Sequence, residues 1–232
     1  KDPEVKPENI CIDVGCANKE EVEKLGIHVG AVAVFEAGSE WLNDQFLIGR
    51  ALDNRMGGFM IAEVARHIKE QKIELPFTLF VVNSVQEEIG LRGAEMISRR
   101  LAPNVAIVTD VTHDTHSPMY NKKLQGDTKC GKGPVVTYGP AVQNNLLQFI
   151  INTANESKID FQRNAVSRST GTDTDSFAYS STGVASALIS LPLKYMHTTV
   201  EMVHKDDIEG CIQLMLASIK KLKEGQTFDY HS

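Results

Sequence analysis

Continuous apolar runs alternate with segments of helical periodicity after residue 50, and this alternation constrains the fold most. Residues Phe59, Ala62, Ala65 and Ile68 are spaced three apart, which predicts a helix with one apolar face. The expected order is helix, strand, helix, strand, over residues 56–71, 76–85, 91–102 and 104–111. Parallel strands buried on both faces consist of such unbroken apolar runs.

A second round of elements follows. We expect a helix over 140–157, a strand over 184–193 and a final helix over 205–224, whose lysines suit the dipole at its C-terminal end. Helices that alternate with buried strands predict an α/β fold, with a mostly parallel sheet and helices on both faces.

The first 50 residues have a different pattern. Short apolar pieces at 10–15, 31–36 and 45–49 are separated by glycine, asparagine and charged clusters, which predicts small β elements. The composition changes near Arg50. We therefore place a domain boundary there and expect two parts, residues 1–50 and 51–232.

Composition excludes some classes of function. The net charge of −6, with no Lys/Arg block longer than a pair, argues against nucleic acid as a partner. The longest apolar runs, such as residues 77–82, fall far short of the roughly 20 residues that span a membrane. The four cysteines form no CxxC pair, so we expect reduced thiols in a cytoplasmic protein.

Metal-capable side chains stand at the ends of the expected strands. Glu87 and Glu88 follow the run 76–85, Asp110 follows 104–109, His197 follows 184–193, and Asp53 precedes the first helix. In open α/β sheets ligands bind beyond the carboxyl ends of the strands, so these side chains should converge.

The paired glutamates suggest two different roles. Neighbouring residues of an extended chain point to opposite sides, so one glutamate can bind a cation while the other faces a water molecule. A bound cation offsets the repulsion and lowers the pKa of water. Each acid alone is equally compatible with a helix cap or a solvated loop. Together they match zinc, cobalt or manganese chemistry, and the pattern leaves both interpretations open.

Five ordered motifs and the opening segment resemble one family. The motifs are ALDNRMGG (51–58), VQEEIGLRGA (85–94), VTDVT (108–112), GTDTDSFA (171–178) and YMHTTVEMV (195–203). They resemble the M42 metalloaminopeptidases, the glutamyl and tetrahedral aminopeptidase group. Residues 8–36 resemble the end of that family's apical β domain, which would make 1–50 a partial apical domain and 51–232 the catalytic domain.

The resemblance implies roles for the clustered residues. Asp53 would bridge two divalent cations, zinc or cobalt, with Glu88 and His197 completing one site and Asp110 belonging to the other. Glu87 would be the general base that takes a proton from the bridging water. The family also implies a cis peptide bond after Asp53, short peptide substrates, and assembly into a homo-oligomer, a dodecamer.

One family motif has no counterpart here. An earlier His-x-Asp motif supplies the remaining ligand, and none of the other histidines lies in such a motif, namely His28, His67, His113, His116, His204 and His231. We therefore expect a fragment that holds at most one metal ion tightly and hydrolyses peptides poorly. His113 and His116 are near Asp110, but Asp110 and His113 should face opposite sides of an extended segment.

The polar segment 169–183 admits two interpretations. Its Gly, Ser, Thr and Asp content is typical of a connecting loop. The resemblance instead places Gly171, Thr172 and Asp173 along the substrate cleft, with Asp173 facing the free amino group of a peptide. Three other functions stay open at this stage: a related metal amidohydrolase, an endoglucanase, and a non-catalytic assembly subunit.

Overall fold

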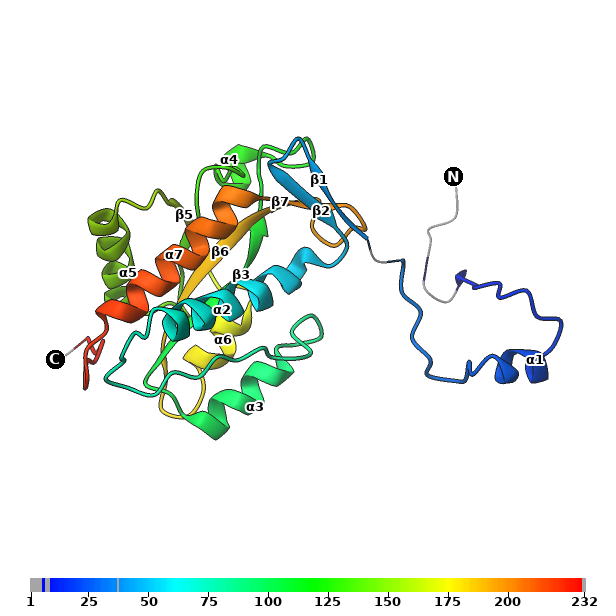
Figure 1. Ribbon diagram of the computed structural model, residues 1–232, viewed down its shortest axis with the longest axis horizontal. Coiled ribbons are helices and arrows are strands. Elements are labelled where there is room, and N and C mark those ends of the chain that lie inside the picture. Colours follow the sequence, from blue (N-terminus) through cyan, green and yellow to red (C-terminus); the bar gives the residue numbers. More distant parts are fainter. Residues whose placement is uncertain (1–5, 7–8, 37, 231–232) are drawn as a thin grey trace. The chain divides into compact units, whose positions relative to one another are not determined.

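The computed structural model describes residues 6, 9–36 and 38–230 and confirms an α/β fold (Figure 1). The chain divides into two compact units, residues 1–36 and 37–232. No helix in the described ranges has the length and apolar character needed to cross a membrane.

The described part of the first unit contains one short helix, α1 (Lys19–Lys24), and no strand. The side chain of Asn18 caps it by accepting a hydrogen bond from the backbone N–H of Glu21. The strands expected at 10–15 and 31–36 are wrong. These segments are largely exposed and have no partner strand in the described part of the unit, and a strand forms only where its backbone groups are paired.

The second unit contains a seven-stranded sheet with the order β1-β2-β7-β6-β4-β5, and β3 pairs with β6. The strands are β1 (Ser39–Leu42), β2 (Phe46–Gly49), β3 (Val105–His113), β4 (Val135–Tyr138), β5 (Gln162–Ala165), β6 (Ala185–Lys194) and β7 (Glu201–His204). β1 and β2 precede the boundary expected near Arg50 but pair within this sheet. The division into domains at Arg50 stays a prediction.

The sheet is mixed, which corrects the expectation of a mostly parallel one. β3 and β6 pair in parallel over nine residues, and β4 and β5 are also parallel, but the other four pairings are antiparallel. Short connections explain the antiparallel pairs of consecutive strands, β1–β2 and β6–β7. Only six residues separate β6 from β7, whereas a parallel crossover needs a dozen or more.

The helices of the second unit are α2 (Leu52–Glu70), α3 (Arg92–Leu101), α4 (Lys122–Gln125), α5 (Asn144–Ser157), α6 (Asp173–Ala178) and α7 (Lys205–Lys221). α7 packs against α2, α5 and β6, and Figure 1 shows α2 (cyan) and α7 (red-orange) lying along the sheet. Nearly all of β6 is buried, and Ile189 and Leu191 are fully buried in the core that these helices share.

Helix α2 exists as expected, but its buried face is different. Phe59 is 49% exposed, whereas Met56, Met60 and Val64 are buried. These three recur every fourth residue and form a stripe against the core, which is the stronger helical signal. The prediction that the helix face containing Phe59 packs against the core is therefore wrong.

The strand expected at 76–85 is also wrong. The segment has no regular secondary structure; Phe77 and Leu79 pack against the core, but Phe80 and Val81 are about half exposed. No strand pairs with it in the described ranges. Its β-rich composition did not produce a strand, because a strand needs a neighbouring strand to hydrogen-bond with as well as residues of high β propensity.

Candidate metal centre

Three of the residues expected to bind metal come together. One ligand atom from each of Asp53, Glu88 and His197 lies within 4.8 Å of the others. Nε2 of His197 is 3.1 Å from Oδ2 of Asp53 and 3.5 Å from Oε2 of Glu88. The Asp53 side chain is nearly buried, while Glu88 and His197 are more than half exposed. The group can therefore be reached from solvent.

Three separate elements supply these side chains. Asp53 lies in the first turn of α2, Glu88 in the connection between 76–85 and α3, and His197 in the turn between β6 and β7. Backbone of positive φ, uncommon for residues other than glycine, occurs at Gln86 and at His197 itself. Such conformations persist where the surrounding contacts fix them and are concentrated at functional sites.

The connection that carries Glu88 is fixed by close backbone contact. The N–H of Gly93 donates to the carbonyl of Val85 over 2.9 Å, and the N–H of Arg92 donates to the carbonyl of Gln86. A Cβ atom on Gly93 would lie 2.4 Å from the Val85 oxygen. Only glycine permits α3 to begin so near this segment.

Asn54 fixes the start of α2. Its side-chain amide donates to the carbonyl of Thr109, next to Asp110 in β3, and its oxygen accepts the N–H of Gly57. The peptide bond between Asp53 and Asn54 is cis, as the family resemblance implied.

A buried carboxylate connects two of the clustered residues. Glu201, at the start of β7, is 1% exposed. One oxygen accepts the backbone N–H of Asp53 at 3.1 Å and the other accepts that of His197 at 2.7 Å. We did not predict a role for Glu201 or Asn54. The only sequence signal for Glu201 is an acid between valine and methionine, which resembles many solvated strand residues.

The electrostatics of this region favour protonated acids. Burial and then the charge of Glu88 raise the pKa of Asp53 to about 6, against the opposing effect of His197. Burial and then the charge of Glu88 raise the pKa of Glu87 to about 7. Burial raises the pKa of Asp110 to about 8, although the N–H of Val111 opposes this. Acids crowded in this way are stabilised as anions by positive charge.

Asp110 is close to the cluster but is not one of its three members. It lies within β3, is buried, and its Oδ1 accepts the N–H of Val111. The charges of Asp53, Glu87 and Asp173 all contribute to its raised pKa, so these acids are near one another.

The segment 169–183 is not merely a loop, because it contains helix α6. Thr172 is the N-cap, and its hydroxyl accepts the N–H of Thr174. The N–H of Gly171, which is exposed with a φ of +68°, donates to Asp175. Asp173 accepts a hydrogen bond from the Ser84 hydroxyl through Oδ2, whereas its buried Oδ1 has no hydrogen-bond partner among the described residues.

Two histidines near Asp110 have other contacts. His113 Nδ1 lies 2.8 Å from the Tyr120 hydroxyl, and His116 Nε2 lies 2.6 Å from Asp127. Burial, followed by the charge of His197, lowers the pKa of His113. Neither histidine belongs to the three-residue group.

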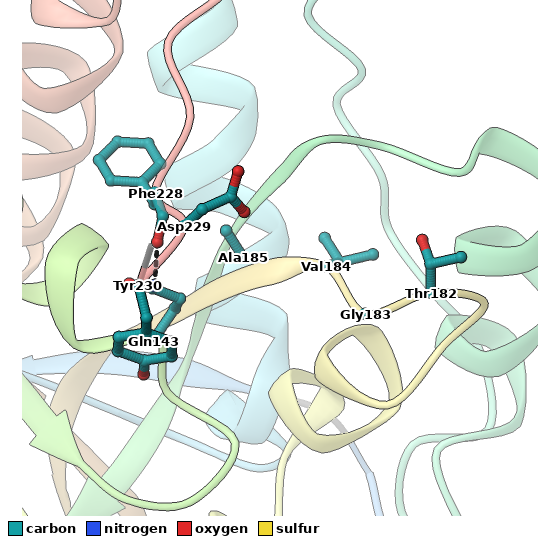
Figure 2. Close-up of a pocket in the computed structure, with 8 residues that line it drawn as sticks. All are labelled: Gln143, Thr182, Gly183, Val184, Ala185, Phe228, Asp229 and Tyr230. Atoms are coloured by element: carbon teal, nitrogen blue, oxygen red, sulfur yellow. Dashed lines mark hydrogen bonds between the residues drawn. The ribbon is translucent and has the colours of Figure 1, made fainter. Parts of the chain in front are cut away.

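An open pocket of about 520 Å³ lies elsewhere, at the opposite end of β6 (Figure 2). Figure 2 shows residues 182–185, which lead into β6, together with Gln143 and residues 228–230. Gln143 donates to the carbonyl of Phe228 there. His197 follows the other end of β6, so this pocket is separate from the acidic cluster.

The donor chemistry of the cluster fits a divalent cation. Zinc binds carboxylate oxygen and imidazole nitrogen, and catalytic zinc sites keep three protein ligands with one open position. Two carboxylates and one imidazole are the set found here.

Comparison with known proteins identifies the family of the chain. A sequence model of the M42 glutamyl aminopeptidases matches residues 1–214. The chain belongs to the M42 glutamyl aminopeptidase family. The predicted resemblance is thereby confirmed.

Individual members of the M42 family match most of this chain. Lysyl aminopeptidase of Pyrococcus furiosus is 34% identical over 93% of this chain and 60% of its own length. An aminopeptidase structure from Desulfurococcus kamchatkensis has a TM-score of 0.82 and 31% identity, covering 90% of this chain and 58% of that one. The Pyrococcus horikoshii TET1 peptidase, which can assemble into a tetrahedron or a large octahedral shell, has a TM-score of 0.71 and 26% identity, with coverage of 90% and 60%. The chain thus spans about three fifths of the length of these M42 relatives.

Proposed function

We propose that this M42 chain is part of a divalent-metal-dependent aminopeptidase that removes N-terminal residues from short peptides. The observation that carries the proposal is the convergence of Asp53, Glu88 and His197 from three elements, with Glu87 beside them. The family membership and the aminopeptidase names of the relatives support it.

Asp53, Glu88 and His197 would hold one zinc or cobalt ion. Such an ion polarises a carbonyl group and lowers the pKa of water. Asp110, together with Asp53, would hold a second ion more weakly, because two carboxylates make a poorer ligand set than three side chains.

Glu87 is the general base of this proposal. Its pKa is raised to about 7 in the metal-free chain, and a bound cation would lower it toward the anionic form that accepts a proton. Glu87 accepts a proton from the water that attacks the carbonyl carbon of the first peptide bond. It then donates that proton to the amine nitrogen as the C–N bond breaks.

Asp173 would bind the amino group of the peptide. Its buried Oδ1 lacks a hydrogen-bond partner, and an ammonium group is a suitable donor. Ser84 contacts the other oxygen, and the cap formed by Thr172 holds the start of α6 in place. Contacts of Gly171 and Thr172 with the substrate stay predictions.

We also propose that the chain works as a homo-oligomer in a reducing compartment, the cytoplasm. Assembly of the P. horikoshii relative into closed shells supports the first point. All four cysteines are free, and Cys130 and Cys211 are buried, which suits a protein that does not depend on disulfides.

Metal analysis combined with peptidase assays tests the proposal. We expect the chain to retain at most one tightly bound ion after dialysis, and Asp53→Asn to retain none. Hydrolysis of amino-acid p-nitroanilides should depend on added zinc or cobalt and stop with a chelator. Two tightly bound ions would contradict the predicted stoichiometry. Metal binding without any hydrolysis would favour a non-catalytic assembly subunit.

A further inference from the structure

Glu201 occupies an unusual position for an acid. Its side chain is 1% exposed, at the start of a strand that pairs on both sides, and it does not belong to the group of three candidate ligands. Burying a carboxylate is costly unless its oxygens are hydrogen-bonded. Both oxygens are, and both partners are backbone N–H groups of candidate ligand residues, Asp53 and His197.

We propose that Glu201 is a positioning residue for the metal centre, an inference that rests on the proposed function. Asp53 and His197 are 144 positions apart, yet one side chain fixes the backbone of both. Because His197 has a φ of +62°, its backbone needs such a restraint to hold the imidazole toward Asp53.

Glu201 acts through the ligands rather than as one of them. Its two oxygens point at the N–H groups of Asp53 and His197, which leaves none directed at the imidazole or the carboxylate of those residues. Partners that orient ligand residues typically contribute 10- to 100-fold to metal affinity. We therefore expect Glu201→Gln, which keeps the shape but turns an NH₂ group toward one N–H, to weaken zinc binding by roughly that factor.

The chain offers a matched control in Asp207. This carboxylate is also fully buried and also accepts two backbone N–H groups, from Gly131 at 2.6 Å and Gly133 at 2.7 Å. It belongs to α7, away from the three clustered side chains. Asp207→Asn makes the same chemical change without touching Asp53 or His197, so zinc affinity should match that of the wild type.

The experiment measures zinc affinity by competition with a chromophoric chelator, and the visible absorption spectrum of the cobalt-loaded chain. Thermal unfolding of each metal-free variant is recorded in parallel. We expect Glu201→Gln to have a lower zinc affinity and a changed cobalt spectrum. Both quantities should be unchanged in Asp207→Asn. Unchanged affinity in Glu201→Gln, or an equal loss in both variants, would overturn the positioning role.

Two further variants keep the outcomes separable. If Glu201→Gln does not fold, Glu201→Asp retains both oxygens but withdraws them by one methylene, and its affinity should still fall; wild-type affinity in that variant would refute the role. If wild type binds zinc no better than Asp53→Asn, the proposed metal function itself fails, and this inference fails with it.

Discussion

Two regions of the second unit differ in what fixes them. The site edge comprises residues 52–54, 84–91 and 195–201. Polar contacts hold this region together. Its backbone has positive φ at Gln86, Tyr195 and His197. The packed layer comprises α5, β6 and α7, where apolar residues such as Leu146 and Leu214 are completely buried. The same chain thus uses hydrogen bonds to place chemistry and apolar contact to provide stability.

The proposed site and the apolar core therefore use different residues. Buried apolar area is the main favourable term in folding, and the packed layer holds most of it. The site edge instead gathers acids whose raised pKa values show that the fold disfavours their charged forms. Substitutions at the site edge should therefore lower catalysis more than stability, and substitutions in the packed layer should lower stability more than catalysis.

The largest expected effect is on catalysis at the site edge. Glu87→Gln removes the proposed base and should lower kcat by roughly 100- to 10,000-fold. Stability should not fall, because the raised pKa of Glu87 means that its charge opposes folding at neutral pH. Steady-state kinetics and thermal unfolding on the same preparation measure both quantities. A large loss of stability would show that the two regions are not separable in this way.

The next effect concerns stability alone, in the packed layer. Burial raises the pKa of Asp207 from 3.8 to about 6, so the folded state binds its proton more tightly than the unfolded chain does. Stability from this group is therefore complete below pH 4 and is lost as the pH rises through 6. Since each pKa unit corresponds to about 1.4 kcal/mol, the loss amounts to about 3 kcal/mol.

Asp207→Asn isolates this contribution, because asparagine does not titrate. The free energy of unfolding of the wild type minus that of the variant should decrease between pH 4 and pH 7. Denaturant titrations at several pH values measure it. A difference that stays constant with pH would show that Asp207 is not destabilised by burial.

The sequence predicted the packed layer better than the site edge for a physical reason. Apolar periodicity located α5, β6 and α7, because burial of a helix or strand face imposes a repeating pattern. It failed for residues 76–85, where β-rich residues have no partner strand, and for the sheet, where the short β6–β7 connection dictates antiparallel pairing.

At the site edge, residue type was predictable and supporting contacts were not. Asp53, Glu88 and His197 could be listed as metal-capable from their chemistry and their places near strand and helix ends, together with Glu87 and Asp110. The resemblance to the M42 family grouped these three as one site. Glu201 and Asn54 could not, since their partners are backbone groups far away in the sequence, such as the Thr109 carbonyl. Nearly every residue type has the same backbone N–H and carbonyl groups, so the residue type of the partner does not reveal such a hydrogen bond.

The smallest expected effect tests how Asn54 of the site edge is held against β3, the strand that pairs with β6 of the packed layer. A Cβ atom on Gly57 would lie 2.5 Å from the side chain of Asn54. Hydrogen bonds to Thr109 and Gly57 hold that side chain in place. A Cβ atom on Gly58 would make only ordinary contact, 3.6 Å from Asn83. Gly57→Ala should therefore cost about 2 kcal/mol through overpacking. Gly58→Ala should gain up to about 1 kcal/mol from the higher helix propensity of alanine. Chemical denaturation of both variants measures the difference. Equal effects would mean that Asn54 moves freely, and that the site edge is less firmly attached to β3 than its hydrogen bonds indicate.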